Sequence, residues 1–220
     1  MVRKKKLAPG NISERTFIYI CDVMRARDEQ KEEAIREEAL KMIVEKGFDG
    51  LSMQKLAKAA GVSPATIYIY YKDRDDLIVQ LWVHEMDKMI DATLRDFDPD
   101  ASFADGLRVQ WMNRARYSIE NPLNSEFLEQ IKHSPYHNVS IDKVDPRFLE
   151  AMQRFVHNGI RRKEIVKLPM EVYWSIAFAP LYNLVRMHMA GRGLGGRQPF
   201  VLDDKMLEQT LKLVIKALTP

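Results

Sequence analysis

The sequence predicts an all-α protein with two domains, a small three-helix helix-turn-helix domain followed by a larger helical domain. Apolar residues recur at intervals of three and four along most of the chain, and Pro, Gly and Asn residues separate these segments. No segment has a convincing strand pattern. A chain of 220 residues is long enough to bury one small and one larger core. We expect the domain boundaries after residues 28 and 75.

The composition is that of an ordinary soluble protein, with 46% hydrophobic and 30% charged residues. The chain has no apolar run of membrane-spanning length, and its basic opening is not followed by a signal-peptide core. We therefore expect a cytoplasmic protein without a membrane partner. The single cysteine, Cys21, excludes an internal disulfide and a cysteine-based metal cluster. We expect no cofactor and no metal.

The first helix of the small domain is predicted over residues 29–46, and Gly47 closes it. Its core face carries Ala34, Ile35, Ala39, Met42 and Ile43. Residues 1–28 form a flexible or extra leader in this interpretation. Its basic cluster, residues 3–6, is either an arm that reaches DNA or a solvated tail. We expect Met24 to be the natural start.

Residues 52–74, SMQKLAKAAGVSPATIYIYYKDR, predict two short helices joined by a turn. The first has an apolar stripe of Met53, Leu56, Ala57 and Ala60. Gly61 favours the left-handed conformation that ends a helix. Ser63 can cap the next helix, and Pro64 fits its first position. So short a turn requires a steep crossing of the helices, as in a helix-turn-helix unit.

The second helix is predicted to project from the surface, because Ile67 and Tyr71 can face inward together. Its small first turn suits a major groove, where Thr66 can meet a base edge, and its hydroxyls and cations suit phosphates. The predicted DNA-binding residues are Ser52, Met53, Gln54, Pro64, Ala65, Thr66, Tyr68, Tyr70, Lys72 and Arg74. The alternative is a packing unit whose tyrosines cover the core.

The second domain is predicted as a series of helices. Asp73 caps a long helix to Phe97, which belongs to both domains. Further helices are expected from the Ser102 and Asp105 capping box to residue 120, then over 125–133, from 145–146 onward, over 169–190 and over 203–218, with a loop between residues 134 and 144.

No catalytic constellation is visible in the sequence. The five histidines are scattered singly, and no serine lies in a GxSxG motif. The glycine-rich run from Gly191 to Gly196 lies between two helices and follows no strand, so we interpret it as a mobile connection. We expect a protein that is not an enzyme.

The run GFDGLSMQKLAKAAGVSPATIYIYYKDRDDLI resembles the DNA-binding domain of the tetracycline-repressor (TetR) family, over roughly residues 31–80. The glycine and phenylalanine after the first helix, the Ala-Gly-Val turn and the Thr-Ile-Tyr of the second helix match in order and spacing. Ile69 and Arg74 depart from the usual pattern. The resemblance implies a homodimer that binds a palindromic double-stranded DNA operator, and a second domain for ligand binding and dimerisation.

The resemblance also implies a small-molecule pocket in the second domain, among aromatic walls with polar groups such as Asn113, Arg116 and His133. The candidate ligand-binding residues are Trp82, Met86, Trp111, Tyr117, Phe127, Phe155, Trp174, Phe178 and Tyr182. The alternative, which we favour for any single residue, is that it is simply part of the core.

In the family, the last two helices build the dimer interface. In this chain the apolar faces of the last two helices carry Val172, Ile176, Ala179 and Asn183 on one helix and Met206, Leu207, Leu211, Val214 and Leu218 on the other. Their periodicity fits an intramolecular core equally well.

We expect a homodimeric DNA-binding transcriptional regulator, more a repressor than an activator, that a small apolar or aromatic ligand releases from its operator. One alternative is the same fold without an inducer, governed by a protein partner or by concentration. A less favoured alternative is an all-helical enzyme, which paired acid and base residues would have supported.

Overall fold

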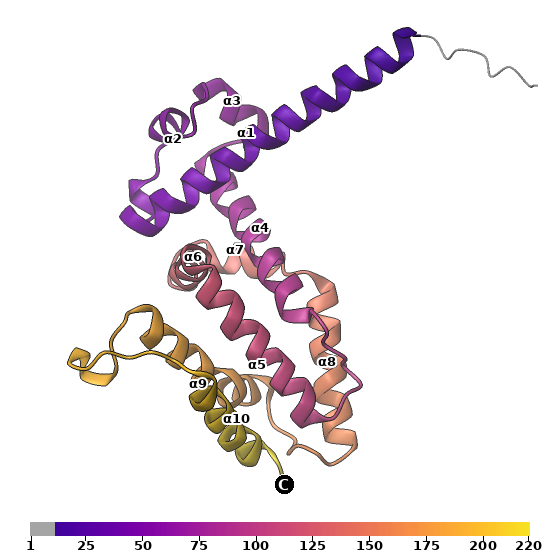
Figure 1. Cartoon of the computed structure of the whole chain (residues 1–220), viewed down its shortest axis with the longest axis vertical. Helices are drawn as coiled ribbons and strands as arrows, with labels where there is room; N and C mark the ends of the chain where they lie inside the picture. The colour runs from indigo at the N-terminus through magenta and orange to yellow at the C-terminus, as the bar shows by residue number, and fades with distance from the viewer. Residues whose placement is uncertain (1–11) are drawn as a thin grey trace, which may run out of the picture. The chain divides into compact units, whose positions relative to one another are not determined.

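The computed structural model describes the backbone of residues 12–220 and the side chains from residue 28 onward, except that of Ile141. The described residues form ten α-helices and one short 3-10 helix, η1, and no strand (Figure 1). The predicted all-α fold class is confirmed. The chain divides into two compact units between Leu77 and Ile78. The basic cluster at residues 3–6 lies outside the described residues.

The first unit begins with α1, which spans Ile12–Gly50. The expected start near residue 29 is wrong, because the helix runs unbroken through this region (Figure 1). Neither glycine nor proline occurs between residues 11 and 46, so nothing in the sequence interrupts helix propagation. Gly47 has a φ of 68° and a non-helical ψ of 176°, so the expected break lies at this glycine.

Two short helices, α2 (Met53–Ala59) and α3 (Pro64–Tyr70), pack against α1 in the first unit. The three helices enclose a small core of residues that are at most 8% exposed. That core contains Ile35, Ala39, Met42, Ile43, Leu51, Leu56, Ala57, Ile67 and Tyr71. The apolar stripes expected on the first two helices therefore supply most of it, although Met53 stays half-buried.

The boundary between the units falls within α4 (Arg74–Leu94). The second unit continues with α5 (Phe103–Glu120), α6 (Pro122–Lys132), α7 (His137–Ile141), α8 (Pro146–Arg161), α9 (Met170–Met189), η1 (Leu194–Gly196) and α10 (Asp204–Leu218). Side-chain caps start several of them. Ser102 Oγ accepts the Asp105 N–H and donates to the Asp105 carboxylate, which is the expected capping box.

Two helix boundaries after residue 77 differ from expectation, and one helix there was not expected. The helix α4 ends at Leu94 rather than Phe97, because Asp96 adopts a left-handed φ of 57°. The helix α6 begins at Pro122 rather than residue 125, since proline is well suited to a first helical turn. The expected loop after residue 133 contains the five-residue α7.

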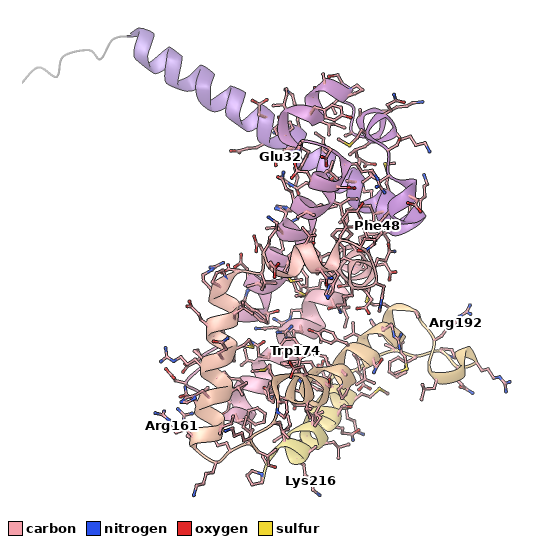
Figure 2. The ribbon with its side chains drawn as sticks, turned by 180° about the vertical axis from the view of Figure 1, so that it is seen from behind. Glu32, Phe48, Arg161, Trp174, Arg192 and Lys216 are labelled. Carbon is pink, nitrogen blue, oxygen red and sulfur yellow. The ribbon has the colours of Figure 1, made fainter. Side chains whose placement is uncertain are left out.

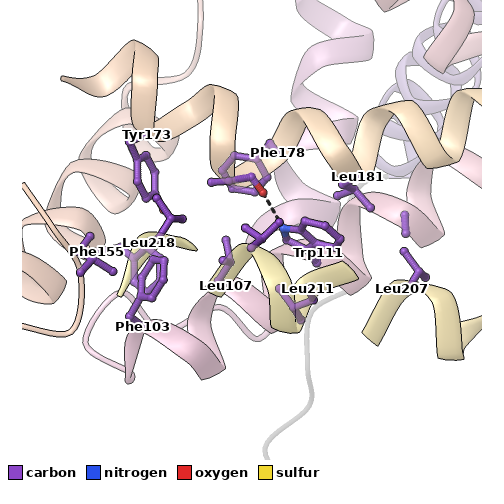
Figure 3. Close-up of a cluster of buried hydrophobic side chains, with 14 of the residues drawn as sticks. Phe103, Leu107, Trp111, Phe155, Tyr173, Phe178, Leu181, Leu207, Leu211 and Leu218 are labelled. Atoms are coloured by element: carbon purple, nitrogen blue, oxygen red, sulfur yellow. Dashed lines mark hydrogen bonds between the residues drawn. The ribbon is translucent and has the colours of Figure 1, made fainter. Parts of the chain in front are cut away.

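The core of the second unit lies between α5, α8, α9 and α10 (Figure 3). Trp111 on α5 is fully buried, and its indole N–H donates to the carbonyl oxygen of Ala177 at 2.8 Å. Leu207, Leu211, Val214 and Leu218 of α10 are at most 5% exposed and belong to the same core. These four residues are therefore core within the chain. Of the other residues expected at the dimer interface, Val172, Ala179, Asn183 and Met206 are exposed and Ile176 is half-buried, so their part in a dimer stays a prediction.

Candidate functional site

The helix-turn-helix geometry rests on local caps. Ser52 Oγ accepts the N–H of Lys55 at the start of α2, and Ser63 Oγ accepts the N–H of Thr66 at the start of α3. Gly61 has a φ of 67°, which a residue with a Cβ adopts only with strain. Pro64 occupies the first turn of α3, where its missing N–H removes no helical bond. The predicted caps are all present.

One side of α3 anchors the helix to its unit. Ile67 and Tyr71 are 0% and 2% exposed, as the sequence predicts. Burial raises the pKa of Tyr71 to about 12, and the Glu32 carboxylate adds to the rise. Tyr70 is half-buried, and its hydroxyl donates to the carbonyl oxygen of Asp28 on α1 at 3.2 Å. The hydroxyl of Tyr70 therefore helps to hold α3 against α1.

The opposite side of α3 is open to solvent. Ala65, Tyr68 and Ile69 follow the i, i+3, i+4 spacing and are exposed, and Lys72 is exposed in the turn that follows α3. We call these four residues the α3 outer face. Tyr68 is 55% exposed and Ile69 is 77% exposed. An isoleucine so exposed on a short, well-anchored helix is a strong mark of a contact surface. The sequence-based list omitted Ile69, although the spacing from Ala65 could have identified it.

The remaining predicted DNA-binding residues lie around the α3 outer face. Pro64 is exposed in the first turn of α3, and Gln54 is exposed on α2. Thr66 is half-buried, and its hydroxyl lies 2.9 Å from Ser63 Oγ, where either oxygen can donate. Ser52 and Met53 are half-buried at the start of α2. Whichever of the two hydroxyls donates, Thr66 therefore keeps hydrogen-bonding capacity for a further partner.

Arg74 is placed differently from the other predicted DNA contacts. Its guanidinium donates from Nε to the carbonyl oxygen of Leu51 at 3.1 Å, and from Nη2 to the carbonyl oxygen of Phe48. These two carbonyls belong to the turn between α1 and α2. The arginine thus ties the start of α4 to that turn, and its donors are engaged within the first unit.

The nine predicted ligand-binding residues do not surround one cavity. Trp111, Phe155 and Phe178 are at most 2% exposed and belong to the packed core, and Phe127 and Trp82 are also buried. Trp174 and Tyr182 are half-buried against that core, and Tyr117 and Met86 are half-buried elsewhere. Aromatic side chains bury large apolar areas, so their burial in a helical core is especially favourable.

A cleft of about 370 Å³ on the second unit reaches only Tyr117 among those nine residues. Its lining is mostly polar and includes Lys88, Arg95, Asn113 and Arg116. Burial raises the pKa of Tyr117, and the Glu85 carboxylate contributes, so its phenol stays protonated at neutral pH. Arg116 is exposed, Asn113 donates to the carbonyl oxygens of Thr93 and Arg95, and the His133 side chain is 80% exposed.

The arginine inside the second unit is Arg114, which the sequence analysis did not select. Arg114 is 2% exposed, whereas Arg116 faces solvent. Residues two apart on a helix lie about 200° apart around its axis, which places them on opposite faces. The sequence could have indicated that Arg114 is buried, because Arg114 follows Leu107 and Trp111 at intervals of four and three on the inward face of α5.

The described residues show neither a metal-binding cluster nor a membrane-spanning helix. Within the described part of the chain, no group of three or more His, Cys, Asp and Glu side chains could hold a metal ion. None of the described helices is long and apolar enough to cross a bilayer.

The helix-turn-helix region matches a known family model. Residues 35–81 match the model for bacterial regulatory proteins of the tetR family. This range begins on α1, contains α2 and α3, and ends in the second turn of α4. The match therefore covers the α3 outer face, its anchors and Arg74.

Two curated proteins are similar to this chain over that region. An uncharacterized HTH-type transcriptional regulator from Haemophilus influenzae is 38% identical over 96 residues, which are 43% of this chain and 51% of that protein. The fatty acid metabolism regulator protein of Bacillus subtilis is 32% identical over 71 residues, 32% of this chain and 37% of that protein. The chain thus spans about half the length, or less, of these two relatives.

Solved structures extend the similarity to the second unit. A TetR family transcription regulator from Marinobacter aquaeolei superposes with a TM-score of 0.69 at 28% identity, covering 88% of this chain and 98% of that one. These two relatives and this structural neighbour are named as regulators, in agreement with the expectation that this chain is not an enzyme. Residues 35–81 thus match the tetR family of bacterial regulatory proteins, and the fold of the chain as a whole is similar to that of a TetR family transcription regulator.

Proposed function

We propose that this protein is a homodimeric, DNA-binding transcriptional repressor that reads its operator with the α3 outer face. The observation that carries the proposal is the exposure of Tyr68 and Ile69 on α3, and of Lys72 directly after it, while Ile67 and Tyr71 anchor the other side. An exposed two-turn helix of this kind fits a major groove. The match to the tetR family model favours the same use.

The residues on and around the α3 outer face have different roles in this proposal. The ammonium of Lys72 and the hydroxyl of Tyr68 contact phosphate oxygens, which position the protein without reading sequence. Thr66 contacts a base edge. Ile69 lies against a thymine methyl, because an apolar side chain gains most from the one apolar group on a base edge in the major groove. Arg74 holds the turn before α2 in place and acts through that turn.

The proposed dimer uses the outward faces of α9 and α10. Val172 and Met170 on α9 are 42% and 44% exposed, and Leu213 and Met206 on α10 are 68% and 38% exposed. Exposed apolar residues on neighbouring helices favour an interface between two copies of the chain. A two-fold dimer presents two α3 helices to two half-sites about 34 to 36 Å apart, so the operator is palindromic.

Ligand control is the finer part of the proposal. A small molecule bound in the second unit would displace α4, and the first four residues of that helix belong to the first unit. A coupling of about 1 to 3 kcal/mol per site would lower operator affinity roughly 5- to 150-fold. The competing possibility, control by concentration alone, requires that no small molecule change operator affinity.

The test selects operator sequences from random duplex DNA and then measures affinity against salt concentration. Lys72→Ala should lower the slope of log affinity against log salt by about 1 and weaken all sequences alike. Lys205→Ala removes the same charge from the exposed start of α10 and should leave the slope unchanged. Failure to select any sequence, or equal slopes for wild type and Lys72→Ala, would refute the proposed interface.

Base reading is tested on the selected operator by substituting each base pair in turn. Thr66→Ala and Ile69→Ala should each relax the preference at one base pair, by roughly 1 to 3 kcal/mol. For Ile69→Ala the relaxed position should be a thymine that 5-methyl removal also weakens in the wild type. Uniform weakening at every position would assign these two side chains to general contact instead of base recognition.

A further inference from the structure

Arg114 is a buried cation without an anionic partner. It lies on α5 and is 2% exposed. Among the described residues, its guanidinium donates from Nη1 to the Tyr182 hydroxyl at 2.7 Å and from Nη2 to Gln110 Oε1 at 3.1 Å, and it has no ion pair. Its Nε is buried and has no hydrogen-bond partner. Burying a charge without a counter-charge is costly, so this arrangement calls for a compensating function.

Aromatic rings supply the rest of the surroundings. The guanidinium carbon of Arg114 lies 4.6 Å from the ring centroid of Phe178, 5.3 Å from that of Trp174 and 5.5 Å from that of Phe148. Cation–π contacts offset part of the desolvation cost, but the rings are neutral. We call Phe148, Trp174, Phe178 and Tyr182 the aromatic cage. Lys132 adds a second cation, 5.5 Å from the ring centroid of Tyr182.

Other arginines of this chain show which group suits the edge of Arg114 that carries Nε and Nη2. Arg36 donates from Nε at 3.0 Å and from Nη2 at 2.8 Å to the carboxylate of Glu33. Arg108 donates from the same two nitrogens, at 2.9 Å and 2.5 Å, to the carboxylate of Glu208. In Arg114 this edge meets only the neutral amide of Gln110. A carboxylate is the group that a guanidinium edge binds most specifically.

The aromatic cage is only partly closed. Phe148, Trp174 and Tyr182 are half-buried, so their outer surfaces face solvent (Figure 2 labels Trp174). Pro180 lies inside α9 between Phe178 and Tyr182, and it cannot donate the backbone hydrogen bond that residue 180 would otherwise make. The helix is therefore locally weaker where it carries the cage. Rotation of Trp174 or Tyr182 would open a path to the guanidinium.

We propose that the second unit binds an organic carboxylate, with the carboxylate on the Nε and Nη2 edge of Arg114 and an apolar body between the rings of the aromatic cage. Binding takes Nη2 from Gln110 and supplies the missing acceptor for Nε. Flat aromatic or extended acyl bodies suit these walls. Neutral molecules of the same shape bind less well, because they leave the buried charge unpaired.

The site is also connected to α4. Gln110 is fully buried, and its side-chain amide donates to the carbonyl oxygen of Thr93 on α4 at 3.2 Å. A carboxylate that replaces Gln110 Oε1 at Arg114 shifts this side chain and its bond to α4. Only this regulatory consequence rests on the proposed function. Binding of the carboxylate itself requires no DNA.

The experiment measures binding by calorimetry and thermal shift in the absence of DNA. The probes are two pairs of equal shape, 2-naphthoate with 2-naphthamide and decanoate with decanamide, so that both body shapes are sampled. The wild type should bind at least one carboxylate tenfold or more tightly than its amide. Equal binding of carboxylate and amide in both pairs would overturn the proposal.

Two variants locate the anion. Arg114→Met should abolish the preference for the carboxylate, and Arg114→Lys, which keeps the charge but lacks the planar fork, should reduce it at least fivefold. Arg116→Met removes the same charge two residues along α5 from an exposed position and should bind like the wild type. A preference that survives in both Arg114 variants would place the anion elsewhere and overturn the proposal.

Thermal unfolding without any probe supplies a readout that does not depend on the choice of ligand. If Arg114 serves an absent anion, Arg114→Met should unfold at the same temperature as the wild type or higher, because it removes an unpaired buried charge. A melting temperature lowered by several degrees would make Arg114 a structural residue and count against the proposal. Operator release by the bound carboxylate is measured afterwards, so failure there refutes the regulatory role alone.

Discussion

Arg74 is partly buried and Arg114 is almost fully buried, and their guanidinium groups have different neighbours. Arg74 in the first unit donates to the backbone carbonyls of Leu51 and Phe48 and lies beside the Asp75 carboxylate. Arg114 in the second unit meets aromatic rings, a phenol and an amide, and its Nε is unsatisfied. An arginine that donates to nearby carbonyls stabilises its own unit. An arginine with an unsatisfied donor can bind a further partner.

The glycines of the two units show a similar contrast. Gly61 in the first unit has a φ of 67° and would have open space around an added Cβ. Gly106 on α5 has no such backbone constraint, but an added Cβ would lie 2.3 Å from a ring carbon of Phe155 on α8. The first unit needs its glycine for a turn, and the second needs its glycine for a close helix contact.

Gly106→Ala should produce the largest effect on stability. The added methyl group collides with the ring of Phe155, which is itself packed against Phe103 and Phe97, so the ring has no free space to enter. We expect a loss of about 3 kcal/mol in the free energy of unfolding, measured by urea denaturation. Gly106→Ala combined with Phe155→Leu should recover part of the loss. No recovery would mean that Phe155 is not the obstacle.

The second largest effect should be a loss of stability of the first unit at alkaline pH, measured as the free energy of unfolding against pH. The pKa of Tyr71 is raised to about 12 in the folded state, above its ordinary value, so the folded state holds the proton more tightly. Its contribution is complete below about pH 10 and is lost as the pH rises to about 12, at a cost of roughly 2 to 3 kcal/mol. Tyr71→Phe should remove this part of the pH dependence. The curve of the variant should otherwise follow the wild type, since Tyr117 and Tyr173 also have raised pKa values through burial.

Arg74→Met tests the assignment of Arg74 as a tie within the first unit. Removing the guanidinium leaves two carbonyl oxygens without their donors, and we expect a loss of about 2 kcal/mol in stability. Arg74→Lys keeps the charge but supplies a single ammonium, so it should restore the stability only in part. If Arg74→Met keeps full stability and weakens DNA binding with a reduced salt slope, Arg74 contacts phosphate as the sequence first indicated.

Gly61→Ala should give the smallest of these effects. A left-handed φ strains an alanine, but nothing lies within 4 Å of the added methyl group, so about 1 kcal/mol is expected. The measurement is the urea midpoint, with Gly61→Asn as the control, because asparagine tolerates this conformation better. An alanine variant more damaging than Gly106→Ala would reverse the contrast between the two units.

The sequence identified the elements that depend on neighbouring residues. The caps at Ser63 and Ser102, the break at Gly47 and the inward pair Ile67 and Tyr71 are all set within a few residues, and each is present in the structure. The boundaries at Leu94 and Ile12 were missed. One depends on the conformation of Asp96, and the other on how far an uninterrupted helix propagates.

By itself, the sequence determined the helical class, the helix-turn-helix unit and the anchored side of α3, because helix periodicity and capping are short-range. The tertiary structure decided the rest. It placed Trp111, Phe155 and Phe178 in the core, directed Arg74 to backbone carbonyls and turned Arg114 inward while Arg116 faces solvent. These outcomes depend on which helices pack together across tens of residues, and a stripe of apolar residues does not specify its partner.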